Sequence, residues 1–230
     1  MVEGRRAPGD ALAWAAERIA ALVRGRALDV GCGEGRFLPR DGVGLDLDPA
    51  RLRVAAARSP HLVQADAHAL PFPSETFDTV LANRMLNEAG RIDDVLAEIR
   101  RVLRPEGQLL VLTLATRSPS TLRRLHDEAR SALGFRRGPR GEDRLDDENG
   151  ASRLERHFAG VRAERFRVTH RFADPAAALD HYARRYLFSR DRDAAQTAAL
   201  FEHVRGALLR TEGEIVDEDA ACLFVATISA

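Results

Sequence analysis

The segment LDVGCGEGRF, residues 28–37, contains residue types that suggest a ligand-binding loop. Three glycines, Gly31, Gly33 and Gly35, stand at alternate positions directly after an apolar run and the acid Asp29. Glycine costs chain entropy wherever it sits, so this density indicates that something approaches the backbone too closely for side chains. A glycine-rich turn between a strand and a helix is also where open α/β sheets bind ligands.

Two familiar nucleotide-binding loops do not match this segment. The dinucleotide fingerprint G-x-G-x-x-G would need a third glycine where Arg36 stands. The phosphate-binding loop G-x-x-x-x-G-K-[ST] needs a lysine, and all 35 basic residues of the chain are arginine. The lack of lysine also removes Schiff-base and lysine-base mechanisms.

The elements around the loop alternate between two hydrophobic periods. Short apolar runs bounded by Gly, Pro or Asp predict strands at residues 27–30, 43–47, 61–64, 79–82 and 108–114, and helical spacing predicts helices at residues 10–24, 49–58 and 92–103. Strands that alternate with helices predict a parallel sheet covered on both faces. The acids Asp46 and Asp66 end the second and third of these strands.

The alternation stops after residue 116. We expect helices at residues 118–133 and 151–158, two more within 175–209, and strands near 162–171 and 221–229. Residues 135–150 are charged and rich in glycine, and they have too few apolar groups to offset their chain entropy, so we expect a mobile lid. We therefore expect one domain over residues 1–230, in which 116–160 and 172–212 are insertions that cap the active site.

Composition narrows the range of functions. The chain has 35 basic and 35 acidic residues, which disfavours a dedicated polyanion-binding protein and favours a small-molecule partner. Its two cysteines, Cys32 and Cys222, are too few for a disulfide framework and show no zinc-ligand spacing, so no metal is predicted. There is no signal-peptide pattern and no membrane-spanning run, and we expect a cytoplasmic protein.

Four motifs at consistent spacing resemble the class I S-adenosylmethionine-dependent methyltransferases, in particular their small-molecule branch. They are the glycine loop with Asp29, the acids Asp46 and Asp66, and the phrases ADAHALPFPSETFDTV (65–80) and EIRRVLRPEGQLLVLT (98–113). The match covers about residues 26–115. The resemblance implies an α/β, Rossmann-like three-layer sandwich with a seven-stranded, mostly parallel sheet whose last strand is antiparallel, and S-adenosyl-L-methionine as cofactor.

The resemblance also implies roles for individual residues. It places Asp29, Gly31, Cys32 and Gly33 around the methionyl end of the cofactor. Asp46 would accept both ribose hydroxyls, because a carboxylate offers two oxygens to two adjacent donors. Around the adenine and the methionyl amine it places Leu47 against the ring, Asp66 as acceptor for the exocyclic amine, the Ala67 backbone at the ring nitrogens, and the Asn83 main chain at the methionyl amine.

The acceptor side departs from the family pattern. The sequence after the fourth strand reads ANRMLNEAGRIDD, whereas relatives of this branch often have histidines near the positions of Arg84 and Glu88. Arg84, with Asn87 beside it, could bind an anionic acceptor, and Glu88 could take a proton as general base. The competing interpretation is an ordinary surface pair at a helix start. Other candidates, each more often structural, are His126, His157, His181, Tyr182 and Tyr186, and we expect His68 to be an exposed polar loop residue.

Taken together, these features predict methyl transfer from S-adenosylmethionine to an O, N or C atom of a small organic molecule. Proximity and alignment supply most of the rate of such a displacement, so catalytic side chains need not be readable from sequence. The alternatives are an RNA methyltransferase, which the lack of an Asn/Asp-Pro-Pro-aromatic motif disfavours, and a non-catalytic cofactor-binding regulatory protein. The sequence does not predict the oligomeric state.

Overall fold

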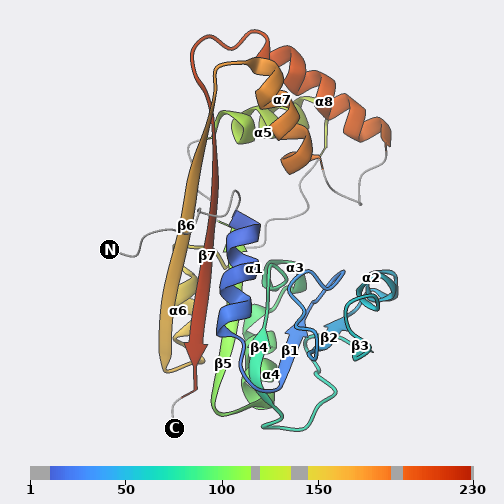
Figure 1. Ribbon diagram of the computed structural model, residues 1–230, viewed down its shortest axis with the longest axis vertical. Coiled ribbons are helices and arrows are strands. Elements are labelled where there is room, and N and C mark those ends of the chain that lie inside the picture. The colour runs from blue at the N-terminus through green and yellow to red at the C-terminus, as the bar shows by residue number, and fades with distance from the viewer. Residues whose placement is uncertain (1–10, 115–119, 136–144, 188–193, 229–230) are drawn as a thin grey trace. The chain divides into compact units, whose positions relative to one another are not determined.

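The computed structural model describes residues 11–114, 120–135, 145–187 and 194–228. The chain divides into two compact units, which we describe one at a time. Unit 1 comprises Met1–Thr116, Gly141–Phe166 and Ala220–Ala230, and unit 2 comprises Arg117–Arg140 and Arg167–Asp219. Two long strands, β6 (Gly160–Phe172) and β7 (Ile215–Thr227), contribute residues to both units (Figure 1). The predicted division into one domain with two capping insertions stays a prediction.

Seven strands form one sheet in the order β3-β2-β1-β4-β5-β7-β6. The first five are β1 (Ala27–Val30), β2 (Val43–Asp46), β3 (Leu62–Gln64), β4 (Phe77–Leu81) and β5 (Leu103–Leu114). β1 pairs in parallel with both β2 and β4, so the strand order reverses at β1. β7 pairs antiparallel with β5, which confirms the predicted mixed sheet with an antiparallel last strand.

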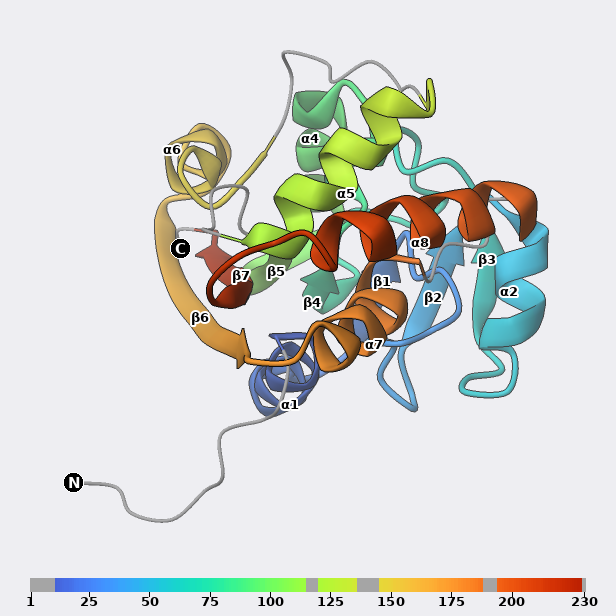
Figure 2. The ribbon, with the colours of Figure 1, turned by 90° about the horizontal axis from the view of Figure 1, so that it is seen from above.

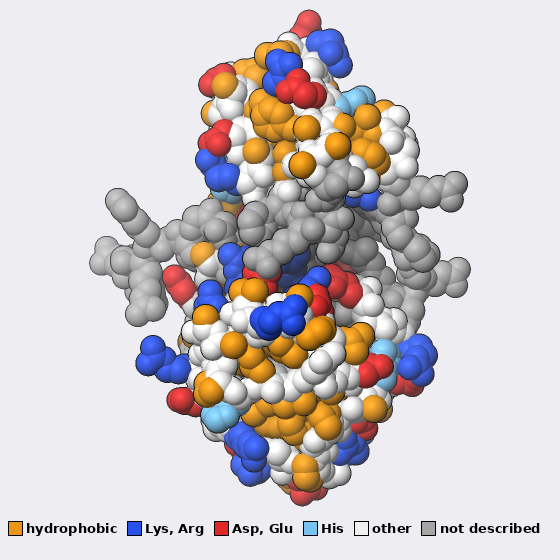
Figure 3. Space-filling view, turned by 90° about the vertical axis from the view of Figure 1, so that its right-hand side faces the viewer, with side chains coloured by type: hydrophobic (Ala, Val, Ile, Leu, Met, Phe, Trp, Pro, Cys, Tyr) orange, Lys and Arg blue, Asp and Glu red, His pale blue; other side chains and the backbone are white. Residues whose placement is uncertain are grey.

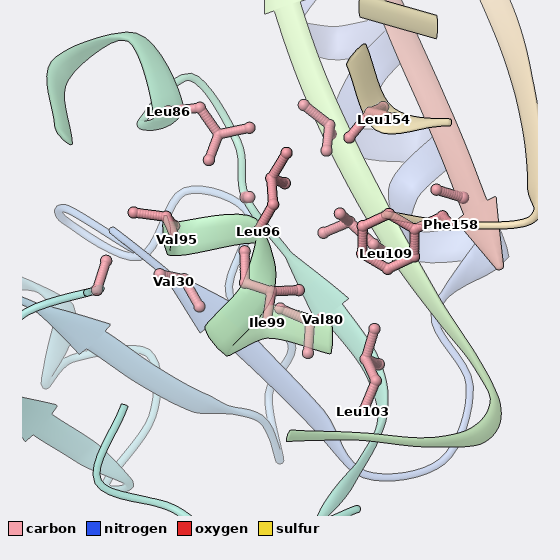
Figure 4. Close-up of a cluster of buried hydrophobic side chains, with 14 of the residues drawn as sticks. Val30, Val80, Leu86, Val95, Leu96, Ile99, Leu103, Leu109, Leu154 and Phe158 are labelled. Carbon is pink, nitrogen blue, oxygen red and sulfur yellow. The ribbon is translucent and has the colours of Figure 1, made fainter. Parts of the chain in front are cut away.

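Both faces of the sheet in unit 1 are covered by helices. α1 (Ala11–Leu22) packs on one face, where Leu223 of β7 is buried, while α4 (Ile92–Val102) and α6 (Gly150–Leu154) lie on the other with Phe224. The apolar residues of α4 recur at helical spacing and point toward the strands (Figure 4). Each large side chain buried in this way contributes about 1.5–3 kcal/mol.

Unit 2 is built around three helices that share one apolar cluster. α5 (Thr121–Ala132), α7 (Pro175–Tyr186) and α8 (Ala194–Leu208) bury Leu122, Tyr182 and Leu200 against each other (Figure 2). A hollow of about 400 Å³ lies beside α8 and is lined mainly by Leu187, Ala198 and Phe201. Figure 3 shows hydrophobic side chains gathered on the surface of this unit, in the upper part of the view.

The last strand begins six residues earlier than its apolar run predicted, at Ile215 instead of residue 221. The sequence does not predict this early start because three consecutive acids, residues 217–219, precede the apolar run. Asp217 is nevertheless fully buried, and it accepts hydrogen bonds from Ser120, from His181 Nε2 at 3.0 Å and from Tyr186 at 2.9 Å. Burial acts to raise the pKa of Asp217, but the bonds from His181 and Ser120 outweigh it and the pKa is lowered. Long-range donors therefore stabilise acids within a strand.

None of the helices in the described ranges combines the length and the apolar character that crossing a bilayer requires.

Candidate active site

The three glycines after β1 all have left-handed backbone conformations, but they face different surroundings. Their φ angles are +65° at Gly31, +56° at Gly33 and +78° at Gly35. A Cβ at Gly31 would lie 2.6 Å from the Cβ of Met85, and one at Gly35 would lie 3.1 Å from Cδ of Arg58. No atom lies within 4 Å of the corresponding position at Gly33. Two glycines thus allow close packing, and the middle one leaves open space for a ligand.

Gly31 provides a test of this packing, because Gly134, at the end of α5, has a similar φ of +70° and no described atom within 4 Å of an added Cβ. Alanine at either site carries the strain of a positive φ, but only at Gly31 does the new methyl overlap Met85. We expect Gly31→Ala to be less stable than Gly134→Ala by about 1–3 kcal/mol, as for other overpacked sites. Denaturant unfolding measures the difference. Equal stabilities would show that Met85 moves aside without cost.

Buried polar atoms without partners lie where β1 and β4 end. Oδ1 of Asp29 and both side-chain amide atoms of Asn83 are buried and make no hydrogen bond within the described residues. Asp29 pairs with Leu81 across the parallel ladder, and Asn83 follows two residues later. Buried polar atoms in folded proteins are nearly always paired, so each exception needs an explanation. These three atoms match a polar ligand that would complete their hydrogen bonds.

The charge state of Asp29 is shaped by the same surroundings. Burial, followed by the nearby charge of Asp46, raises the pKa of Asp29 to about 8. The pKa of the neighbouring Cys32 thiol is also raised, to about 12, by burial and then by the charges of Asp29 and Asp46. Cys32 is therefore a neutral space-filling residue in the loop. The pocket at the end of β1 disfavours negative charge and favours a cationic ligand group.

Asp46 connects the end of β2 to the glycine loop. Its Oδ2 accepts from the Gly33 amide at 2.7 Å, and its Oδ1 accepts from the Asp48 amide at 2.9 Å. Asp48, not Asp46, caps the following helix α2 (Pro49–Ala55) through the Ala50 amide at 2.7 Å. Asp46 therefore does not cap a helix, although its bond from the Asp48 amide forms an Asx turn after β2. Leu47, between the two acids, is 67% exposed, which is unusual for a large apolar side chain.

The loop after β3 carries a contact that the sequence did not predict. Oδ1 of Asp66 accepts from the His68 amide at 2.9 Å and lies 2.7 Å from Nδ1 of the same residue. The His68 side chain is only 15% exposed, so the expectation of an exposed loop residue was wrong. Long-range packing explains the difference, because Nε2 reaches the Gly90 carbonyl at 3.2 Å. Ala67, between them, is buried.

The segment after β4 carries the candidate acceptor residues. Arg84 has a left-handed φ of +62° and lines a small cavity at the ends of β4 and β5. The short helix α3 (Leu86–Ala89) begins only after Arg84, so Arg84 and Glu88 are not one helical turn apart and they form no ion pair with each other. Both side chains are exposed beside the start of α3, without an ion pair between them. The interpretation of Arg84 and Glu88 as surface residues therefore stays open, as does their predicted role at the acceptor.

Asn87 is engaged elsewhere in unit 1. Its side chain donates to the Leu145 carbonyl at 2.8 Å and accepts from the Leu145 amide at 2.7 Å. Its predicted contact with the substrate stays a prediction. Residues 145–150, the end of the predicted lid, begin with the buried Leu145 and continue into α6, while residues 136–144 lie outside the described ranges.

The histidines and tyrosines considered as further candidates have structural partners. Within unit 1, His157 contacts Asp93 at 2.8 Å. Within unit 2, His126 contacts the Tyr182 hydroxyl at 2.9 Å, and His181 and Tyr186 bond to Asp217 as described above. These contacts support the structural interpretation of all five. The predicted cofactor residues, in contrast, all lie at or just after the carboxyl ends of β1, β2, β3 or β4 in unit 1.

This strand order, with a glycine loop at the point of reversal, defines the fold of the class I methyltransferases. Among solved structures, the [4+2]-cyclase SpnF aligns with a TM-score of 0.57 and 21% identity, covering 94% of this chain and 82% of its own. Likeness at that identity shows the fold alone. A cyclase on this fold also means that the fold does not fix the reaction.

Sequence comparison finds relatives for part of the chain. Residues 28–111 match the family described as "Methyltransferase domain". The chain is 36% identical over 113 residues to the malonyl-[acyl-carrier protein] O-methyltransferase of Halorhodospira halophila, covering 44% of this chain and 37% of that protein. It is 38% identical over 97 residues to the fatty-acid O-methyltransferase of Mycolicibacterium smegmatis, covering 37% and 35%. The matches thus span less than half of this chain and little more than a third of either relative, and they show that residues 28–111 are similar to a methyltransferase domain.

Proposed function

We propose that this protein transfers a methyl group from S-adenosylmethionine to a small organic acceptor. The observation that carries the proposal is the set of three unpartnered buried atoms on Asp29 and Asn83 beside the open position at Gly33. The methionyl end of the cofactor has an ammonium and a carboxylate, which match a carboxylate acceptor and an amide that both donates and accepts.

The buried, free thiols of Cys32 and Cys222 further support a reducing compartment such as the cytoplasm.

The remaining residues at this edge would hold the other parts of the cofactor. Asp46 already accepts one backbone amide on each oxygen, and each oxygen keeps a lone pair for a ribose hydroxyl. The exposed Leu47 offers an apolar surface for the adenine, with Asp66 and the Ala67 backbone at its edge. When bound, the cofactor supplies an electrophilic methyl on a sulfonium. The protein then orients that methyl and excludes water.

Asp46 and Asp48 form a matched pair for testing this arrangement. We expect Asp46→Ala to weaken S-adenosylmethionine binding by about 2–3 kcal/mol, because two ribose hydroxyls and the Gly33 amide lose a charged acceptor. Asp48→Ala removes the cap of α2 and an exposed ion pair with Arg51 at 3.6 Å, so it should lower stability by about 1 kcal/mol and leave affinity unchanged. Titration calorimetry measures both affinities. Equal affinity in the wild type and Asp46→Ala would overturn the ribose assignment.

The acceptor side centres on Arg84 and Glu88. Desolvation lowers the pKa of the Arg84 guanidinium, Glu88 acts against that shift, and Arg36 adds a like charge from the glycine loop. Two cations facing one acid suit an anionic acceptor, which Arg84 would orient with Asn87 beside it. Both relatives described above are O-methyltransferases of acids, which supports a carboxylate on the acceptor. Native mass spectrometry with S-adenosylmethionine and a metabolite pool would detect acceptors that gain a methyl group.

The positive φ of Arg84 allows a glycine substitution that distinguishes a role in binding the acceptor from a structural role. Glu106 has nearly the same φ, 63° against 62°, and lies at the opposite end of β5 from the site. Glycine relieves left-handed strain, so Arg84→Gly and Glu106→Gly should each gain up to about 1 kcal/mol of stability. We expect only Arg84→Gly to raise the KM for the acceptor, by about tenfold or more. An unchanged KM in Arg84→Gly would remove Arg84 from the acceptor site.

A further inference from the structure

His68 joins two segments that follow different strands. Its Nδ1 lies 2.7 Å from Oδ1 of Asp66, after β3, and its Nε2 lies 3.2 Å from the carbonyl of Gly90, which ends α3. The His68 side chain is 15% exposed, whereas that of Asp66 is 56% exposed. The ring is therefore enclosed between the two segments, and the carboxylate that it contacts remains open to a ligand.

The two oxygens of Asp66 have different surroundings. Oδ1 receives both the backbone amide and the ring nitrogen of His68. Within the described residues, Oδ2 receives no hydrogen bond. The His68 amide, then its ring, and more weakly the charge of Arg91 lower the pKa of Asp66. Asp66 is thus a carboxylate with one oxygen held by the protein and one available to a ligand.

We propose that His68 is a positioning residue for adenine recognition. By holding Oδ1 of Asp66, it fixes the rotation of the carboxylate and leaves Oδ2 as the single acceptor for the exocyclic amine. The contact between Nε2 and Gly90 holds the ring itself in place. This inference rests on the proposed function, because it assumes that Asp66 contacts the adenine. Its consequence is selectivity, since a fixed acceptor favours an amino group and disfavours an oxo group at the same position.

Two ligands measure that selectivity directly. S-adenosylhomocysteine carries the amine, and S-inosylhomocysteine carries an oxygen in its place, so their affinity ratio depends on the Asp66 contact. We expect the wild type to prefer the adenosyl compound by about tenfold or more, and His68→Ala to reduce that preference to about threefold or less. Calorimetry with both ligands gives the ratio. A general loss of packing would lower both affinities together and leave the ratio unchanged.

Amide replacements identify which ring nitrogen matters. The side-chain nitrogen of Asn reaches about as far as Nδ1 of histidine, and that of Gln about as far as Nε2. His68→Asn should therefore keep the Asp66 contact and most of the preference, whereas His68→Gln should keep only the Gly90 contact and lose the preference. If Gln preserves the ratio as well as Asn does, the inference is wrong.

Two controls separate this inference from the proposed function. His157→Ala removes another His–Asp contact of unit 1, at 2.8 Å and with a side chain 20% exposed, and should leave the ratio unchanged. Asp66→Asn should abolish the preference whether or not His68 positions it. A ratio lost in Asp66→Asn but kept in His68→Ala overturns the role of His68 alone. If the wild type binds neither ligand, the proposed function itself fails.

Discussion

Replacing Asp29 with asparagine is expected to weaken S-adenosylhomocysteine binding by about 100-fold, because a buried charged acceptor for the ligand ammonium is lost. The same change should make the ligand-free protein more stable. The pKa of Asp29 in the folded chain, about 8, lies above its ordinary value of 3.8. The unfolded chain therefore releases the proton first, and the free energy of unfolding falls as pH rises between these two values. Asparagine at this position cannot ionise, so Asp29→Asn should not lose this stability as the pH rises.

Proton release gives an independent measurement of the same residue. At about pH 6.5 the ligand ammonium keeps its proton, while Asp29 is still protonated in the free protein. Binding should then release about one proton, which calorimetry in buffers of different ionisation enthalpy detects. Asp29→Asn should release none. Equal proton release by both proteins would contradict the assignment of the ammonium to Asp29.

Replacing Glu88 with glutamine is expected to distinguish two kinds of acceptor. Turnover should fall by about 100-fold or more if the acceptor loses a proton during transfer, as for a general base, and should stay within about twofold if the acceptor is an ionised carboxylate. Glu88 lies in the first turn of α3, is exposed and forms no ion pair within the described residues, so the substitution should change stability by less than about 0.5 kcal/mol. Turnover is measured with an acceptor identified by mass spectrometry. Cofactor affinity should stay at the wild-type value.

Asp94 is the matched control for Glu88. It is exposed in the first turn of α4 and forms an ordinary ion pair with Arg91 at 3.0 Å. Asp94→Asn should leave turnover within a factor of about two. If Glu88→Gln also keeps full turnover at every pH tested, no general base acts there. Alignment alone would then account for catalysis, as suits an acceptor carboxylate that is already ionised.

The residues proposed to bind the cofactor were predictable because they lie close together in sequence or at the ends of predicted strands. Asp29, Gly31 and Gly33 lie within five residues, and strand ends place Asp46 and Asp66 at the same edge of a parallel sheet. Short continuous apolar runs likewise predicted the five parallel strands β1 to β5, since a sheet covered on both faces needs apolar residues on both.

The features that were missed depend on contacts between distant residues. The bond from Asn87 to Leu145 spans 58 positions, and the contact of His68 with Gly90 spans 22. The early start of β7 depends on the bond from Ser120 to Asp217, which spans 97 positions. No local pattern encodes such pairs, because the polar side chain alone looks like a surface residue and its partner, in two of the three pairs a backbone group, lies far along the chain. The unpartnered side chain of Asn83 could have been found from sequence, because a polar amide stands directly after an apolar strand. The resemblance instead implied a role for its main chain.

The shortness of α3 has a consequence for how the position of Glu88 could change. A helix of four residues has almost no stability of its own, so neighbouring contacts set its orientation. Here Met85 packs at Gly31 on one side, and Asn87 holds the Leu145 backbone on the other. Substitutions of Met85 or Asn87 would change the orientation of Glu88 without altering the sheet, so acceptor selectivity can change through a few mutations outside the strands.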